Sequence, residues 1–211
     1  MTYLYIDTSS PFLYAGIVED DKLLSERKEE LRENLSKDAL YEISEMFNEA
    51  NKFPDSVDKI IVVNGPGSFT GIRIGITIAK VYAWAKKLKI TTCSSLLAMA
   101  LSSDNKTNHV PVIDARNDFL YAAIYDENNN EILKPAFIEK SKLINELSKL
   151  DNYEIITNNT IEDLLDSQKY DPNILKIVEH LKDKEDIDPH AVNPEYLKLT
   201  AAEESKKWLS Y

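Results

Sequence analysis

Asn64-Gly65-Pro66-Gly67-Ser68-Phe69-Thr70-Gly71-Ile72-Arg73-Ile74-Gly75 is the stretch that decides the fold of this 211-residue chain. Four of the five glycines of the sequence lie in it. An unbroken apolar run, Ile60 to Val63, precedes it, and a helix-length segment reaching about Lys87 follows it. A buried strand, a glycine turn and a helix form the layout of a phosphate cradle, because free N–H groups at the start of a helix attract anions.

The glycine spacing matches neither of the common phosphate-binding motifs. A P-loop would end in Gly-Lys-Ser/Thr, whereas Ile72 follows Gly71 here. The dinucleotide fingerprint, G-x-G-x-x-G, would place its third glycine at position 70, whereas the glycine here is Gly71. Two interpretations therefore stay open: a nucleotide or anion site, and a tight strand-to-helix turn in which Ser68 or Thr70 caps the helix.

The helix after this turn carries a stripe of small residues. Gly71, Gly75, Ala79 and Ala83 recur at every fourth position and therefore share one face. The other faces are apolar too, so the helix should be covered on more than one side. We expect the stripe to meet a helix of a second protein, with an internal core helix as the alternative. On the first interpretation, Ala79→Leu would weaken association and leave the monomer folded.

The composition favours a cytosolic protein that does not bind nucleic acid unaided. Lys and Arg number 25 against 36 Asp and Glu, for a net charge of −11, so the chain lacks the basic face that phosphate contacts need. The single cysteine, Cys93, excludes an internal disulfide, fits a reducing compartment and should be an inert buried thiol. The N-terminus does not resemble a signal peptide, and no transmembrane segment is expected.

Both halves of the chain show the same pattern of elements, β-β-β-α-β-α. In the first half we expect strands at 3–6, 13–18, 23–28, 60–63 and 88–93, and helices at 35–51, 71–87 and 95–101. In the second half we expect strands at 110–113, 119–125, 131–138 and 154–157, and helices at 142–150, 160–167, 174–181 and 201–209. We therefore predict a duplicated α/β protein with two lobes, residues 1–103 and 104–211.

An acidic turn ends the first strand of each half. Asp7 follows the strand at 3–6, and Asp114 follows the strand at 110–113. In a duplicated α/β fold two such turns can face one cleft. There Asp7 and Asp114, with Gly65 and Gly67, would form a nucleotide or anion site in which the carboxylates hold phosphate through a metal or a water. The alternative is that each aspartate only closes an Asx-turn.

The quoted stretch closely resembles the signature of the TsaB (YeaZ) family. Ile6-Asp7-Thr8, Ile113-Asp114-Ala115-Arg116 and Pro194-Glu195-Tyr196-Leu197 resemble further landmarks of that family, in the same order. The resemblance is strong over residues 1–126 and thin over residues 127–190. It implies the duplicated ribonuclease-H-like, two-lobed α/β fold of the actin, Hsp70 and sugar-kinase superfamily.

The resemblance also implies a function. The family is a non-catalytic paralogue of TsaD, which completes threonylcarbamoyl transfer to N6 of adenosine 37 in tRNAs that read codons beginning with A. Its members pair with a TsaD-like catalytic subunit, are joined by a TsaE-like ATPase, and form homodimers when alone. TsaD-like proteins hold a metal with two histidines, and the matching positions here are Ser95 and Met99. We therefore expect no catalysis, no required cofactor and no bound zinc or iron, and leave ATP or ADP binding open.

The family uses the helix after the glycine turn to pack against its paralogue or against itself. The expected interface residues are Gly71, Arg73, Gly75, Ile76, Ala79, Tyr82 and Ala83. Arg73 is unusual, because a cation near the start of a helix opposes the helix dipole. We expect it to pair with an acidic side chain of this chain or of a partner.

Two functions from other classes remain as alternatives. One is a stand-alone small-molecule kinase or ATPase of the acetate- and sugar-kinase superfamily. The other is a metallopeptidase, against which the missing metal ligands argue: none of His109, His180 and His190 has another histidine three to five residues away.

We expect the isolated chain to bind tRNA weakly or not at all, because its net charge of −11 repels the phosphate backbone. A gel shift near physiological ionic strength checks this. A salt-dependent complex with a micromolar dissociation constant would contradict it.

Overall fold

The apolar strands at the centre of the first lobe supply two cores at once. The computed structural model of the protein describes residues 1–31, 34–158, 161–164 and 166–198. In it, β1 (Thr2–Asp7) pairs in parallel with β4 (Lys59–Gly65). Because successive side chains of a strand point to opposite faces, Ile61 enters the core that faces the second lobe, and Ile60 enters the core beneath two helices. The predicted burial of this strand on both faces is confirmed.

The two five-stranded sheets share one strand order. The first sheet runs β3-β2-β1-β4-β5 and the second runs β8-β7-β6-β9-β10. In each sheet the first three strands along the chain pair antiparallel, and the two later strands run parallel to the first. The remaining strands are β2 (Phe12–Glu19), β3 (Lys22–Glu30), β5 (Lys89–Ser94), β6 (Asn108–Asp114), β7 (Phe119–Tyr125), β8 (Glu131–Glu139), β9 (Tyr153–Thr157) and β10 (Ser167–Lys169). The predicted duplicated α/β fold is therefore confirmed.

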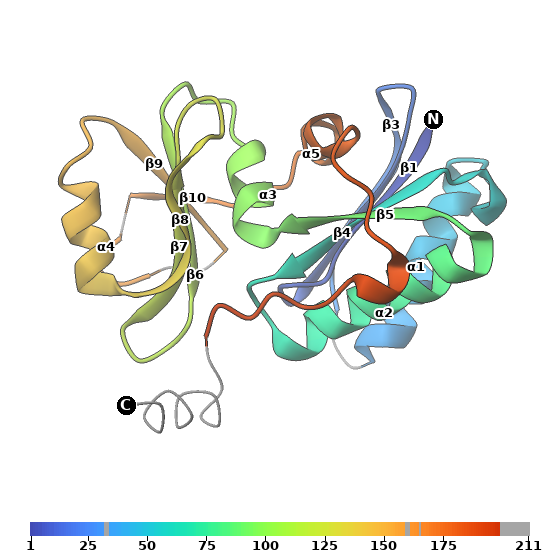
Figure 1. The fold of residues 1–211 in the computed structure, drawn as a ribbon, viewed down its shortest axis with the longest axis horizontal. Coiled ribbons are helices and arrows are strands. Elements are labelled where there is room, and N and C mark those ends of the chain that lie inside the picture. The colour runs from blue at the N-terminus through green and yellow to red at the C-terminus, as the bar shows by residue number, and fades with distance from the viewer. Residues whose placement is uncertain (32–33, 159–160, 165, 199–211) are drawn as a thin grey trace.

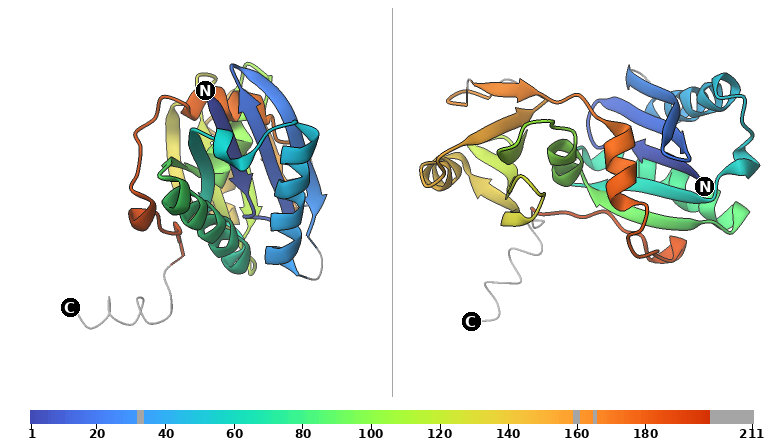
Figure 2. Two further views of the ribbon diagram at one scale, coloured as in Figure 1. Left: turned by 90° about the vertical axis from the view of Figure 1, so that its right-hand side faces the viewer. Right: turned by 90° about the horizontal axis from the view of Figure 1, so that it is seen from above.

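Helices cover the outer faces of the two sheets and fill the space between them (Figures 1 and 2). On the first sheet, α1 (Leu35–Glu49) and α2 (Phe69–Lys86) lie side by side, and α4 (Lys140–Leu147) packs on the second sheet. Between the sheets, α3 (Ser95–Leu101) and α5 (Ile174–Leu181) join a core to which both lobes contribute. Two short 3-10 turns, η1 (Pro54–Ser56) and η2 (Pro189–Ala191), complete the described elements. None of the helices described is long and apolar enough to cross a membrane.

Serine side chains fix where two of the helices begin. Ser68 Oγ accepts a hydrogen bond from the N–H of Gly71 (3.2 Å), and Ser94 Oγ accepts one from Leu96 (3.3 Å). Each bond satisfies one of the free N–H groups at a helix start. The predicted capping role of Ser68 is confirmed, and α2 begins directly after the glycine turn.

The prediction of a helix over residues 160–167 is wrong where the structure describes this segment. Ile161 and Leu164 have helical spacing and are both buried, but they belong to a turn in which Leu164 N donates to Ile161 O (3.0 Å). Asp163 between them has a φ of 70°, in the left-handed region. The chain then forms β10, so the second half reads β-β-β-α-β-β-α from β6 to α5. The helix predicted over 201–209 lies outside the described residues.

After β10 the chain returns to the first lobe. Residues 182–198, which we call the C-terminal strap, run along the edge of β5 and then beside α2 (Figure 1, red). Ile187 bridges to Ile90, and Glu195 N donates to Asn64 O at 2.7 Å. Val192 is buried in the core beneath α2. The second lobe predicted for residues 104–211 thus includes a segment whose contacts are with the first sheet.

His109, on β6, is a buried base with an unsatisfied nitrogen. Its Nδ1 has no hydrogen-bond partner among the described residues and lies 3.6 Å from Glu154 Oε2. That oxygen already accepts a hydrogen bond from Ser103 Oγ at 2.5 Å. Burial lowers the pKa of His109, because the imidazolium would lose its hydration, and Glu154 opposes this effect.

We expect the free energy of unfolding to fall as the pH drops below about 6.5, the ordinary pKa of histidine. In that range the unfolded chain binds a proton that the folded chain binds less readily, so stability rises with pH. His109→Asn should flatten this dependence by at most about 1.4 kcal/mol per pH unit. Urea unfolding between pH 7 and pH 5 measures the slope. Equal slopes for wild type and His109→Asn would refute the assignment.

Candidate functional site

The glycine turn between β4 and α2 is packed against the chain's own backbone. A side-chain carbon at Gly67 would collide with the carbonyl oxygen of Ser9, and one at Gly65 with that of Glu195. Both glycines also have φ values, 152° and 122°, that other residues rarely adopt. The turn therefore brings β1, α2 and the C-terminal strap together. This packing gives no support to the predicted anion site at Gly65 and Gly67, which stays a prediction.

A cleft of about 400 Å³ separates the lobes, and both acidic turns line it. Asp7 reaches it from the end of β1 and Asp114 from the end of β6. Gly67 also lines the cleft, whereas Gly65 is not among its described lining residues. The structure thus brings together three of the four residues that the sequence suggested for one cleft.

Hydrogen bonds in the two acidic turns match the Asx-turn interpretation. Asp7 Oδ1 accepts from the N–H of Ser9, and Asp114 Oδ1 from that of Arg116, both at 2.8 Å. Asp7 is only 2% exposed, and burial raises its pKa although the hydrogen bonds from Ser9 oppose the rise. A raised pKa disfavours the ionised carboxylate that a divalent cation and its phosphate would require. The nucleotide or anion site at Asp7 and Asp114 stays a prediction.

The two positions at which the resemblance implies metal ligands hold neutral side chains here. Ser95 and Met99 both line the inter-lobe cleft, and Ser95 Oγ donates to Pro66 O at 2.5 Å. Across the part of the chain that the structure describes, no group of three or more His, Cys, Asp or Glu could hold a metal ion. Cys93 is buried as predicted, and burial raises its pKa, which disfavours a reactive thiolate.

The small-residue stripe of α2 faces the first sheet, so the prediction that it meets a partner is wrong. Five of the seven expected interface residues are buried inside the monomer: Gly71, Gly75, Ile76, Ala79 and Ala83. The reason is steric, because Gly75 leaves room for Thr8 Oγ1, and a Cβ there would collide with it. The alternative of an internal core helix is confirmed for this face. Of the expected interface, Arg73 is exposed and Tyr82 is half-buried.

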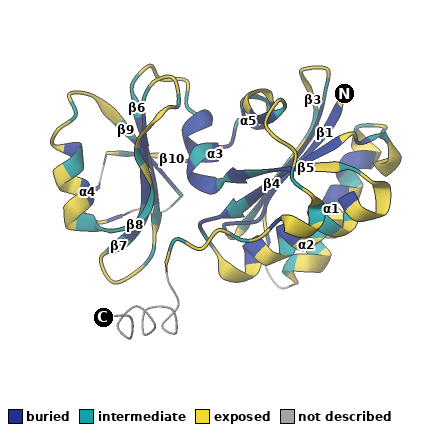
Figure 3. Cartoon of the chain, viewed as in Figure 1, coloured by how far each residue is buried: buried dark blue, intermediate teal, exposed yellow. Residues whose placement is uncertain are grey.

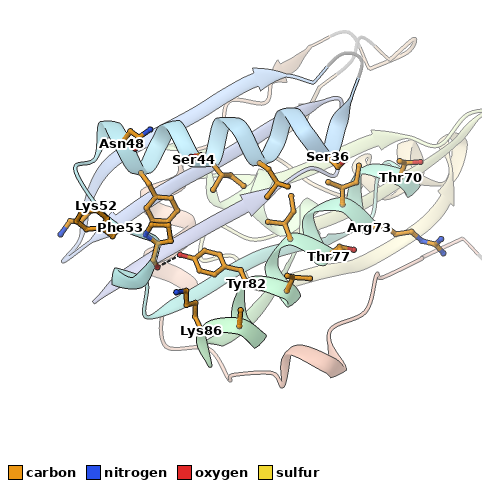
Figure 4. Close-up of a pocket in the computed structure, with 18 of the residues that line it drawn as sticks. Ser36, Ser44, Asn48, Lys52, Phe53, Thr70, Arg73, Thr77, Tyr82 and Lys86 are labelled. Atoms are coloured by element: carbon orange, nitrogen blue, oxygen red, sulfur yellow. Dashed lines mark hydrogen bonds between the residues drawn. The ribbon is translucent and has the colours of Figure 1, made fainter.

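The other face of α2 and the neighbouring α1 form an apolar groove of about 880 Å³ at the surface (Figure 4). Near one end, Tyr82 Oη donates to Pro54 O at 2.5 Å, the dashed line in Figure 4. Large apolar side chains are exposed along the groove: Leu40, Phe53, Phe69 and Val81. Apolar surface of this extent marks an interaction site. In Figure 3 both helices show exposed residues among buried and intermediate ones.

From the described lining of this groove, sequence reasoning named Arg73 and Tyr82 but missed the large apolar residues. Val81, which lines the groove, is 61% exposed, yet it lies on a helix whose every face is apolar. The apolar residues on every face of α2 were the sequence signal from which this surface could have been predicted. Once the small residues are assigned to the sheet, the large ones on the opposite face must be exposed or meet a partner.

The charged residues among the described lining of the groove are all cations: Lys52, Arg73 and Lys86. Lys52 is paired with Glu19 at 2.6 Å, and Lys86 is paired with Asp55. Arg73 has no ion-pair partner among the residues that the structure describes. The groove therefore offers one unpaired cation on a chain whose net charge is −11.

We expect Ala79→Leu to lower the melting temperature of the monomer. Ala79 is fully buried on the face of α2 that packs on the first sheet, and a larger side chain overpacks that site. The cost should be about 1–3 kcal/mol. Thermal melts of the monomeric protein measure it, and the exposed Thr77→Leu on the same helix serves as the control. An unchanged melting temperature, with association weakened, would restore the earlier interpretation of the stripe.

Comparison with known proteins connects this architecture with tRNA modification. A family model described as TsaD, tRNA N6-adenosine threonylcarbamoyltransferase, matches residues 28–173. The tRNA threonylcarbamoyladenosine biosynthesis protein TsaB of Bacillus subtilis (strain 168) is 29% identical over an alignment of 227 residues, which covers 99% of this chain and 98% of that protein.

Solved structures show the same fold. YeaZ from Pseudomonas aeruginosa matches with a TM-score of 0.70 at 18% identity, over 93% of this chain and 99% of that one. A second crystal structure from Pseudomonas aeruginosa, of an uncharacterized protein with similarity to peptidase YEAZ, matches with a TM-score of 0.75 at 18% identity and the same coverage.

Proposed function

The chain belongs to the TsaB (YeaZ) family, within the wider group that the TsaD model describes, and on that premise we propose that it is a non-catalytic partner subunit in tRNA threonylcarbamoyladenosine biosynthesis. In this role it associates with a TsaD-like catalytic subunit. That subunit transfers the threonylcarbamoyl group to N6 of adenosine 37 in tRNAs reading codons that begin with A. A TsaE-like ATPase joins the two proteins.

The apolar groove between α1 and α2 is the observation that carries this proposal. The TsaD model spans residues 28–173 and so covers both helices, which means that a TsaD-like protein has counterparts of them. A helix pair on one subunit can then pack against the corresponding pair on the other. The exposed Leu40 and Val81, which line the groove, supply the apolar area that such a contact buries. A second copy of this chain presents the same surface, which accounts for a homodimer when the partner is absent.

A supporting rather than catalytic role agrees with the inter-lobe cleft. Ser95 and Met99 offer no ligand for a hard metal there. The core beside the cleft is built from both lobes and from α3 and α5, so opening the lobes would expose apolar surface. Catalysis and tRNA binding are assigned to the partner, because the net charge of −11 disfavours tRNA binding by this chain alone.

A stand-alone ATPase or small-molecule kinase is the second candidate. It is favoured by the position of Asp7 and Asp114 on one cleft. ATP hydrolysis by the isolated chain, compared with hydrolysis by the assembled complex, separates the two functions. Turnover by the chain alone at the rate of the complex would favour the second candidate.

We expect Val81→Asp to weaken the complex with the TsaD-like subunit at least about tenfold, because a charge would be buried in an apolar contact. Isothermal titration of the two purified subunits measures the dissociation constant. Threonylcarbamoyladenosine formed in a reconstituted reaction should fall in parallel.

Ile144 on α4 supplies a matched control for this substitution. It is an exposed aliphatic side chain on the second lobe, so Ile144→Asp should leave both the dissociation constant and the modified tRNA unchanged. Wild-type protein that forms no complex, or a reconstituted reaction that runs equally well without this chain, would refute the proposed function.

A further inference from the structure

Arg73 carries a positive charge that no carboxylate of the described chain neutralises. It is the fifth residue of α2, near the helix end at which the dipole disfavours a cation. It is exposed and has no carboxylate partner among the described residues, whereas Arg27 bonds Glu42 and Glu49 at 2.8 and 2.6 Å. Figure 4 shows Arg73 extending outward from α2 near the Thr70 end of the groove.

Two aromatic rings hold the guanidinium of Arg73 in place. Its central carbon lies 3.8 Å from the ring centroid of Phe69, and its Nε donates to Tyr196 Oη at 2.8 Å. The two rings are stacked with centroids 5.3 Å apart, and Tyr196 belongs to the C-terminal strap. A guanidinium fixed on aromatic faces loses less freedom when it binds a further group.

This arrangement leaves the binding end of the guanidinium free. With Nε engaged by Tyr196, the two terminal nitrogens of Arg73 have no hydrogen bond to any described residue. These nitrogens form a planar fork that matches the two oxygens of a carboxylate. The other cations of the groove, Lys52 and Lys86, are already paired.

We infer that Arg73 is the anchor for a carboxylate side chain of the TsaD-like partner, held in place by Phe69 and Tyr196. The inference rests on the proposed function and adds the chemistry of the contact. An apolar groove gives area but little orientation, whereas a bidentate ion pair at one end fixes the direction in which the partner helices lie. On a chain of net charge −11, an unpaired cation selects for an acidic group at that point of the partner.

The test compares dissociation constants for the TsaD-like subunit at low and high salt. Arg73→Gln should weaken binding about tenfold to a hundredfold at low salt and reduce its salt dependence. Arg73→Lys should restore only part of the affinity, because lysine keeps the charge but neither stacks nor presents a fork. Tyr196→Phe removes only the hydroxyl that holds Nε and should cost about two- to tenfold.

Lys142→Gln is the matched control, since it removes one positive charge from the exposed surface of α4 in the other lobe. It should leave the dissociation constant unchanged, and an equal loss with both variants would reduce the effect to net charge and overturn the anchor. If Arg73→Gln also lowers the melting temperature, the salt titration still decides, because a loss of packing leaves the salt dependence of binding intact.

Glu203 and Glu204 follow Tyr196 closely in the sequence and are an alternative source of a carboxylate. The double variant Glu203→Gln/Glu204→Gln should bind the partner as wild type does, and a loss equal to that of Arg73→Gln would assign Arg73 to its own chain. A complex whose affinity is unaffected by Arg73→Gln would overturn the anchor and leave the proposed function standing. Absence of any complex with the wild-type chain would overturn both.

Discussion

The close approach of α2 to the end of β1 is the constraint on which the rest of the structure depends. Gly71 lies against the carbonyl oxygen of Thr8, and Thr8 Oγ1 donates back to Gly71 O at 2.7 Å. A Cβ at Gly71 or Gly75 would collide with Thr8 and push the helix away from the sheet. Because α2 lies so close to the first sheet, its small residues complete the core between the helix and the sheet. Its large apolar residues remain on the opposite face, where they form the groove with α1.

A shared core ties the two lobes together in a way that bears on the cleft between them. Tyr5 and Val63 from the first sheet, Tyr125 from the second, and residues of α3 and α5 belong to one buried cluster. The cleft is therefore bordered by apolar contacts whose exposure would cost about 25 cal/mol per Å². In the duplicated α/β fold a cleft can serve as a site that opens and closes. Here the surface with the properties of a contact site is the groove on the outside of the first lobe.

Among the described residues that line the groove, one cation is left without an ion-pair partner. Glu19 and Asp55 neutralise Lys52 and Lys86, and both pairs are partly exposed, so each contributes little to stability. Arg73 instead stacks on Phe69 and donates a hydrogen bond to Tyr196 Oη, contacts that hold a guanidinium without neutralising it. Tyr196 comes from the strap, 123 residues further along the chain, so its position depends on the fold of the first lobe as a whole.

The sequence by itself determined the elements, because strand and helix periodicity and the glycine turn are local properties. The apolar run at Ile60 to Val63, the cap at Ser68 and the repeated strand pattern all matched the structure. One local pattern misled, since Ile161 and Leu164 have helical spacing but lie in a turn.

Only the tertiary structure decided which face of α2 is buried. A helix that is apolar all round has no preferred side until it packs on the sheet. Spacing showed that Gly71, Gly75, Ala79 and Ala83 share a face. Whether that face meets β1 or a partner depended on the space that Thr8 leaves. The cluster of Phe69, Arg73 and Tyr196 was likewise beyond the sequence, since nothing local brings residues so far apart in the chain into contact.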